Sequence, residues 1–300
     1  MSLKTQIIYV PGMKPKPPVH DHEEALWRCM LNGVERADPA VAADLAQHRD
    51  AFSVIPWSSL FYQETADIEP DRSGLEKLLA SSGPAEEDIR EARHWHKRLG
   101  RLAYLLSDAF PALIDWVANP NLKSTLQDTQ RYFRNHAGVA TAIRRLVAER
   151  LREVCASDTR VLLIAHSLGS VISFDVLWQL THREHSDVSI DQFLTIGSPL
   201  GLNFMRHRML NAKSTGKRRY PHNIQRWVNL SAVGEMTALD RTFADDYREM
   251  LELGLIDTIE DQINLQTYFR GPQGLNVHKC YGYMANEKTG AVIADWYRRT

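Results

Sequence analysis

The chain has 300 residues, enough for one large α/β domain or two small ones with a sizeable buried core. Hydrophobic residues make up 44% of it and charged residues 24%, a composition typical of soluble globular proteins. The 36 basic and 37 acidic residues leave a net charge of −1, which argues against an overall attraction to nucleic acid or anionic lipid. Cys29, Cys155 and Cys280 are widely spaced and odd in number, so they favour neither a metal site nor a disulfide framework.

The N-terminal segment does not have the pattern of a targeting sequence. The apolar run that begins near residue 7 is too short and too polar in its flanks for a signal peptide. No apolar run along the chain approaches the roughly 20 residues that a membrane-spanning helix needs. We therefore expect no transmembrane segment and a cytoplasmic location.

Short apolar runs alternate with longer segments of helical spacing along the chain. The predicted strands, in chain order, are 6–10, 51–57, 161–165, 192–196, 224–230 and 263–269. The predicted helices are 22–36, 86–117 with a break near Pro111, 131–154, 170–180 and 285–296, and residues 65–82 are predicted as loop. Strands that alternate with helices predict an α/β fold with a doubly wound, mostly parallel sheet. We expect one domain over residues 1–300, in which about 65–125 form a helical cap insertion.

The segment around Ser167 is the most informative part of the chain. The apolar run 161–165 indicates a buried parallel strand, and a helix is predicted from residue 170. Ser167 therefore lies on a tight turn between a strand and a helix N-terminus, where backbone N–H groups can stabilise an oxyanion. This is the context of a serine nucleophile elbow, Gly-x-Ser-x-Gly, with Ala165 in place of the first glycine. The alternative is an ordinary strand-to-helix turn that carries a serine.

A serine nucleophile needs a general base, and the base needs an acid that orients it. In a doubly wound sheet these groups gather at the carboxyl ends of the strands. His278 lies between the last predicted strand and the last predicted helix, where a base is expected. Glu235 and Asp240 follow the predicted strand 224–230, and Glu235 is favoured because it is the first acidic residue after that strand. Asp240 remains the alternative acid.

An oxyanion hole needs two backbone donors directed at the developing negative charge. The first is expected to be the N–H of Leu168, the residue after the nucleophile. The second is expected in the turn after the first strand, where Gly12 allows a sharp bend and the N–H of Met13 would donate.

With these features the chain resembles the serine hydrolases of the α/β-hydrolase fold, in the broad esterase and lipase-like branch. The order nucleophile, acid, base along the chain is the order of that family. The resemblance implies hydrolysis of a carboxylic ester in a small-molecule acyl substrate through an acyl-enzyme, with no metal and no organic cofactor. It is carried by Ile164-Ala-His-Ser-Leu-Gly169, Val10-Pro-Gly-Met13, Ile196-Gly-Ser-Pro199, Trp227-Val-Asn229 and His278-Lys-Cys-Tyr281.

Other functions remain open at this point. The same triad serves thioesterases, amidases and acyltransferases, and a chain can keep the fold as a binding protein without turnover. The cluster His20-Asp-His-Glu-Glu24 has metal-ligating residue types, but acidic residues are also typical of the first turn of a helix. We expect no nucleic-acid partner, and the sequence does not set the oligomeric state.

Overall fold

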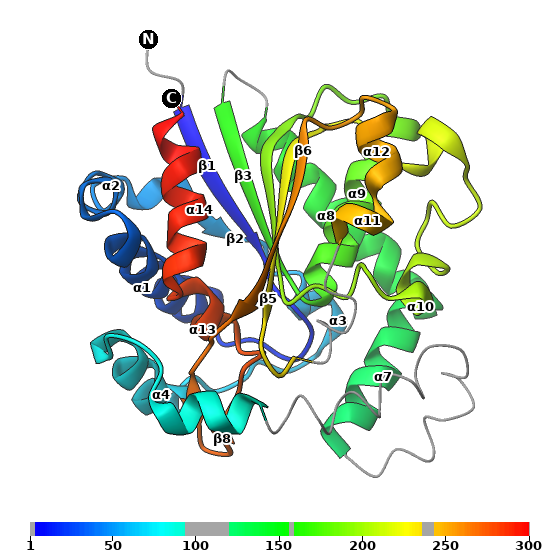
Figure 1. Ribbon diagram of the computed structural model, residues 1–300. Helices are drawn as coiled ribbons and strands as arrows, with labels where there is room; N and C mark the ends of the chain where they lie inside the picture. The colour runs from blue at the N-terminus through cyan, green and yellow to red at the C-terminus, as the bar shows by residue number, and fades with distance from the viewer. Residues whose placement is uncertain (1–3, 94–119, 156–158, 236–242, 300) are drawn as a thin grey trace.

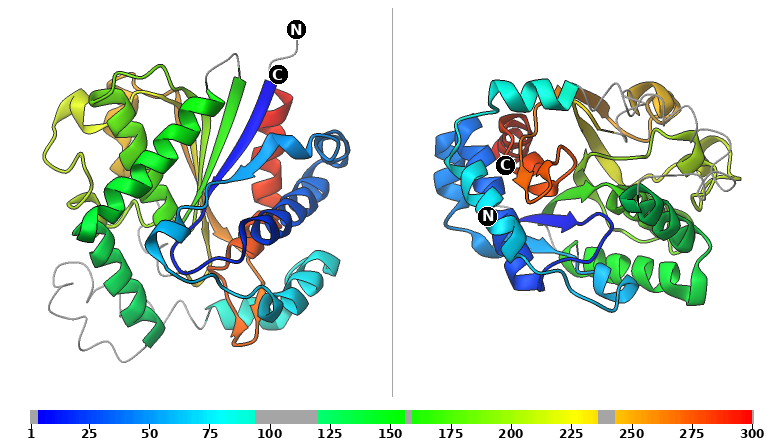
Figure 2. Two further views of the ribbon diagram at one scale, coloured as in Figure 1. Left: turned by 180° about the vertical axis from the view of Figure 1, so that it is seen from behind. Right: turned by 90° about the horizontal axis from the view of Figure 1, so that it is seen from below.

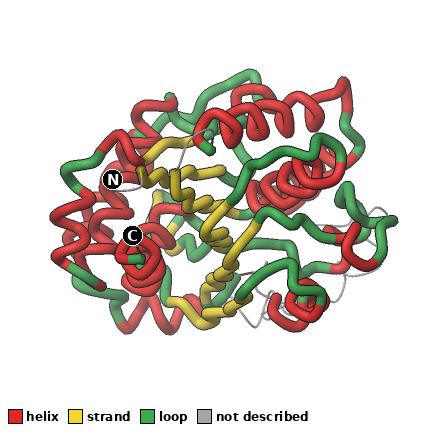
Figure 3. The backbone as a smooth tube through the Cα atoms, turned by 90° about the horizontal axis from the view of Figure 1, so that it is seen from above, coloured by secondary structure: helices red, strands yellow, loops and turns green. Residues whose placement is uncertain are grey.

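The computed structural model describes residues 4–93, 120–155, 159–235 and 243–299. Six strands form one sheet in the order β2-β1-β3-β4-β5-β6, and every neighbouring pair is parallel. The sheet runs through the middle of the molecule with helices on both sides (Figures 1 and 3). The predicted α/β architecture is therefore confirmed. The strands are β1 Lys4–Val10, β2 Phe52–Val54, β3 Thr159–His166, β4 Ile190–Ile196, β5 Ile224–Ala232 and β6 Thr258–Leu265.

Two helical layers cover the sheet. Helices α1, α2 and α14 lie against one face, and α8 and α9 lie against the other (Figures 1 and 2). The main helices are α1 Val19–Ala37, α2 Pro39–Leu45, α4 Glu69–Ala80, α7 Pro120–Phe133, α8 Val139–Val154, α9 Leu168–His182 and α14 Glu287–Arg298. The shorter ones are α3 Ser58–Phe61, α10 Asn203–Arg206, α11 Phe243–Asp246, α12 Arg248–Glu252 and α13 Cys280–Met284, and a two-stranded hairpin pairs β7 Arg270–Gly271 with β8 Gly274–Leu275.

The central strands β1 and β3 each contain a run of consecutive buried apolar residues because both of their faces are covered. In β1, Ile7 belongs to the core under α1 and α14, whereas Ile8 belongs to the core under α8 and α9. In β3, Leu162 and Leu163 divide between the same two cores. Successive side chains of a strand point to opposite faces, so a strand buried on both sides reads as a continuous apolar run. This burial on both faces is the reason that apolar runs in the sequence predict the central strands.

The prediction of a loop over residues 65–82 is wrong, because residues 69–80 form helix α4. Proline and glycine are typical of loops, and Pro70 and Gly74 are the residues that favour a loop in this segment. Pro70 lies in the first turn of α4, where a proline is favourable because its missing N–H has no intrahelical partner. Gly74 packs so closely on the hairpin that a Cβ atom there would lie 2.1 Å from the backbone oxygen of Arg270.

Two further boundaries differ from the predictions. The helix predicted over 131–154 is two helices, α7 and α8, separated by a turn in which Asn135 and Gly138 have positive φ. The strand predicted over 263–269 is β6, which begins five residues earlier at Thr258. β6 is an edge strand, so it carries the polar residues Glu260 and Asp261, and its sequence lacks the apolar run of a central strand.

Part of the predicted cap insertion lies outside the described residues. The predicted helix 86–117 is helical over 86–93, and residues 94–117 are not described. The cap therefore stays a prediction. None of the helices in the described ranges combines the length and the hydrophobicity needed to cross a membrane.

Candidate active site

Ser167 connects β3 to α9 with an unusual backbone conformation. Its φ of 53° and ψ of −129° lie in a region that residues with a side chain rarely occupy. Hydrogen bonds hold this conformation on both sides: the N–H of Ser167 donates to the carbonyl of Ile196 at 3.1 Å, and its carbonyl accepts from the N–H of Ser170 at 3.0 Å. Such locally strained residues persist only where their surroundings hold them, and they cluster at functional sites.

The small residues of the elbow are required by close packing. A Cβ atom on Gly169 would lie 2.4 Å from the backbone oxygen of Val10, and one on Gly12 would lie 2.8 Å from the Cβ of Ser167. Ala165, at the first small position of the motif, is completely buried. The turn after β1 and the start of α9 therefore touch, which brings Gly12 directly against Ser167.

The structure brings Ser167, His278 and Glu235 together. Nε2 of His278 lies 3.0 Å from Oγ of Ser167, and Nδ1 lies 2.5 Å from Oε1 of Glu235. The side chain of His278 is 41% exposed, whereas that of Glu235 is fully buried. The imidazole can therefore face an incoming substrate while its carboxylate partner is shielded from water. Asp240, the alternative acid, lies outside the described residues.

Tyr283 on α13 holds the other oxygen of Glu235. The hydroxyl of Tyr283 accepts from the N–H of Ala232 at 2.9 Å and lies 2.5 Å from Oε2 of Glu235. Because the backbone N–H can only donate, the single phenolic hydrogen is free to point at the carboxylate. Burial raises the pKa of Tyr283 well above its usual value, so it stays a donor. Glu235 thus has both oxygens directed toward hydrogen-bond donors.

His166, the residue before the nucleophile, contacts the backbone of His278. Nε2 of His166 donates to the carbonyl of His278 at 2.9 Å, and the two rings lie 4.8 Å apart. Burial lowers the pKa of His166 well below its usual value, so its ring is neutral. The sequence predicts no role for His166, which is quoted there only as part of the elbow motif, and none for Tyr283. His166 could have been noticed as a histidine inside the elbow motif, but no sequence signal marks Tyr283.

The expected oxyanion donors lie on the two elements that meet at Ser167. Leu168 is the first residue of α9, and the N–H groups of a first helical turn have no intrahelical acceptor. Met13 follows Gly12, which touches Ser167. The carbonyl of Met13 accepts from Nζ of Lys16 at 2.5 Å, which restrains the turn on its far side.

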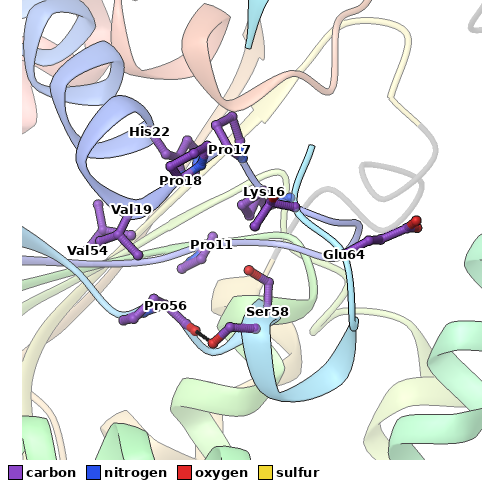
Figure 4. A pocket seen from close by; sticks show the side chains of 12 residues that line it. Pro11, Lys16, Pro17, Pro18, Val19, His22, Val54, Pro56, Ser58 and Glu64 are labelled. Atoms are coloured by element: carbon purple, nitrogen blue, oxygen red, sulfur yellow. Dashed lines mark hydrogen bonds between the residues drawn. The ribbon is translucent and has the colours of Figure 1, made fainter. Parts of the chain in front are cut away.

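An apolar cluster and a small pocket lie near the edge of the sheet at which the strands have their carboxyl ends. The cluster joins α7 to α10 and contains Leu126, Phe204 and Met205, with Phe133 and Leu202 packed against it. The pocket lies on the β2 side of the turn after β1 and is lined by Pro11, Lys16, Pro18, His22, Pro56 and Ser58, among others (Figure 4). Desolvation lowers the pKa of Lys16 to about 8 and that of His22 to about 3.

Among the described residues, no three His, Cys, Asp or Glu side chains gather as a metal site would require.

The fold and the comparison with known families define a broad class of protein. The six-stranded parallel sheet flanked by helices is consistent with the α/β-hydrolase fold. Residues 99–210 match the family described as lecithin:cholesterol acyltransferase, a range that includes β3, Ser167, α9 and β4. This match supports a hydrolase-like serine enzyme of the acyl-transferring kind, and it ends before Glu235 and His278. No curated protein and no solved structure matched the chain.

Proposed function

We propose that this protein cleaves a carboxylic ester through an acyl-enzyme. Ser167 is the nucleophile, His278 the general base and Glu235 the acid that orients it. The observation that carries the proposal is the continuous contact from Oγ of Ser167 through the imidazole of His278 to the buried carboxylate of Glu235. The strained elbow at Ser167 adds to it, because that backbone conformation presents the hydroxyl away from the strand and the helix.

Acylation follows from the geometry of the three side chains. The hydroxyl of Ser167 gives its proton to Nε2 of His278 as Oγ attacks the ester carbonyl. The Nδ1–H of His278 points at Glu235, so the ring becomes an imidazolium beside a carboxylate. The tetrahedral intermediate then collapses: its bond to the alcohol oxygen breaks, and the imidazolium gives the proton to that oxygen. The acyl group remains on Ser167.

The negative oxygen of the tetrahedral intermediate needs donors already in place. The N–H groups of Leu168 and Met13 fill this role in the proposal, one from the start of α9 and one from the turn after β1. The positive end of the α9 dipole adds to the stabilisation. Removing one such donor in other serine enzymes costs about 2.7–4 kcal/mol of transition-state stabilisation.

The acyl-enzyme can be released in two ways. Water, activated by His278, gives hydrolysis, whereas an alcohol that occupies the same place gives acyl transfer. The match to a lecithin:cholesterol acyltransferase family favours transfer to an alcohol as the second candidate function. The same match, with the apolar cluster between α7 and α10, supports an ester of a lipid acyl chain as the substrate class.

Covalent labelling of the serine tests the proposal directly. We expect a fluorophosphonate to label the native protein with one equivalent and not to label Ser167→Ala. Ser189→Ala is the control, because Ser189 is an exposed serine that lies just before β4, at the end of that strand away from Ser167. Folded native protein that resists labelling would point to a binding protein without turnover.

A series of acyl esters of increasing chain length would identify the acyl group. Each ester would be supplied with and without an excess of a sterol or a simple alcohol, which would identify the acceptor. A rise in kcat/KM with chain length supports the lipid acyl group. A transesterified product supports transfer, and free acid alone supports hydrolysis.

A further inference from the structure

The residue that follows the expected oxyanion donor has a strained backbone of its own. Lys14 has a φ of 81°, a left-handed conformation that residues with a side chain rarely adopt. It is one of the few non-glycine residues with positive φ in the described part of the chain, and Ser167 is another. The turn therefore needs contacts that hold it in this shape.

The peptide unit between Met13 and Lys14 is hydrogen-bonded at both ends. Its carbonyl accepts from Nζ of Lys16, and its N–H donates to the hydroxyl of Tyr62 at 3.0 Å. On the other side of Met13, Gly12 is wedged against Ser167. Met13 therefore lies between two restrained points, and the direction of its N–H depends on both.

Asp128 on α7 ties these contacts together. Its Oδ2 accepts from the hydroxyl of Tyr62 at 2.9 Å and from Nζ of Lys14 at 3.0 Å. Burial raises the pKa of Tyr62, which keeps its hydroxyl protonated. Because the phenolic hydrogen points at Asp128, the oxygen of Tyr62 is available to accept from the N–H of Lys14. The carboxylate thus orders both the side chain and the backbone of Lys14.

Two more contacts connect α7 to the same turn. Nζ of Lys14 lies 2.7 Å from Oγ of Ser124, and Oγ1 of Thr129 lies 3.9 Å from the sulfur of Met13. Ser124, Asp128 and Thr129 thus form one side of α7 that faces the turn after β1. The side chain of Asp128 is 18% exposed, so its ion pair with Lys14 is partly shielded from water.

From this network we propose that Asp128 is a positioning residue for the oxyanion hole: acting through Tyr62 and Lys14, it fixes the turn that directs the N–H of Met13 at the tetrahedral intermediate. The inference rests on the proposed function, because it assigns a donor to the intermediate formed at Ser167. The hydrogen bonds of Asp128 are to Lys14 and Tyr62 and not to the three triad residues. Its effect is therefore on the stability of the intermediate and not on binding of the ester in its ground state.

Asp128→Asn tests this role, since the amide keeps the size of the side chain and removes its charge. We expect kcat to fall about 10- to 100-fold with KM changed less than twofold, less than the loss for complete removal of an oxyanion donor. A trifluoromethyl ketone, which forms a tetrahedral adduct with Ser167, should bind more weakly by the same factor as kcat/KM. Asp128→Glu should recover part of the loss. Gln127→Ala, an exposed change on the same helix, is the matched control.

Tyr62→Phe provides a second, independent variant. It should lower kcat in the same way, and the double variant Tyr62→Phe with Asp128→Asn should be no worse than the more impaired single variant, because both remove one network. If Asp128→Asn fails to fold, Tyr62→Phe alone decides. Unchanged kcat, or weaker turnover with unchanged affinity for the ketone, overturns the inference. Failure of the native protein to react with a fluorophosphonate would instead overturn the proposed function.

Discussion

Replacing Glu235 with glutamine is the sharpest test of the proposed triad. The carboxylate lies 2.5 Å from Nδ1 of His278 and 2.5 Å from the hydroxyl of Tyr283, and it is fully buried. A glutamine amide has one acceptor oxygen and one donor NH₂ group in place of two acceptors. If the NH₂ faces His278, the imidazole must carry its proton on Nε2 and cannot accept the proton of Ser167. If the oxygen faces His278, the NH₂ opposes the O–H of Tyr283.

The size of the effect follows from what the carboxylate contributes. The glutamine either fixes the wrong tautomer of His278 or removes the negative charge beside the imidazolium. Loss of the corresponding charge in a serine triad lowers kcat by about 10⁴. Because the acid here is fully buried and therefore little screened by water, we expect a decrease of 10³- to 10⁴-fold, or about 4–5 kcal/mol in the activation free energy.

The assay is steady-state hydrolysis of a chromogenic acyl ester by Glu235→Gln and by Asp240→Asn. We expect Asp240→Asn to keep kcat within about threefold of the native value, an effect below 1 kcal/mol. Thermal unfolding of both variants confirms that each is folded. A folded Glu235→Gln that retains more than a tenth of the native kcat would refute the reasoning. A large loss in Asp240→Asn instead would assign the acid to Asp240.

Three further predictions concern stability and positioning. Tyr283→Phe removes the hydroxyl that contacts the N–H of Ala232 and Oε2 of Glu235. We expect the free energy of unfolding, measured in urea, to fall by about 1–3 kcal/mol and kcat to fall about tenfold. Unchanged values would contradict the assigned contacts. Gly169→Ala places a Cβ atom 2.4 Å from the backbone oxygen of Val10 and should lower the free energy of unfolding by about 1–3 kcal/mol or more. Gly83→Ala is the control, because a Cβ atom there meets open space, and it should change the free energy of unfolding by no more than about 0.5 kcal/mol. His22 and His166 have pKa values held below 6.5 by burial, so the unfolded chain binds protons that the folded protein does not as the pH falls. The His22 pKa of about 3 should therefore lower the unfolding free energy by about 2 kcal/mol between pH 7.5 and pH 5, and His166 should act in the same direction. His22→Gln should reduce the pH dependence by about 2 kcal/mol, and an unchanged pH dependence in the variant would exclude this origin.

The interior strands could be predicted from the sequence because burial on both faces leaves a continuous apolar run. β3 follows this rule over residues 161–165, and the turn at Ser167 follows from the strand before it and the helix after it. β6 could not be placed in the same way, because an edge strand is only partly buried and tolerates Glu260 and Asp261. Helix α4 was missed because Pro70 and Gly74 have roles that depend on their neighbours in the folded chain.

The contact between Ser167, His278 and Glu235 could be expected because parallel strands bring their carboxyl ends to one edge of a sheet. The order of the residues along the chain then limits the choice of base and acid. The residues that hold this arrangement could not be inferred in the same way. Tyr283 and Asp128 act through hydrogen bonds across 48 and 114 residues of sequence, to Glu235 and Lys14 respectively, and such partners are set by side-chain packing.

The parts of the site come from the beginning, the middle and the end of the chain. Gly12 follows the first strand, Ser167 follows the third, and His278 comes after the last strand of the main sheet. During synthesis Ser167, the proposed nucleophile, is made 111 residues before His278, the proposed base. In the proposed mechanism, a nascent chain that has formed β1 and β3 would therefore have the elbow but would lack the base that activates it. Reaction of Ser167 with a covalent probe would then report that the whole chain has folded, because long-range contacts of this kind form late.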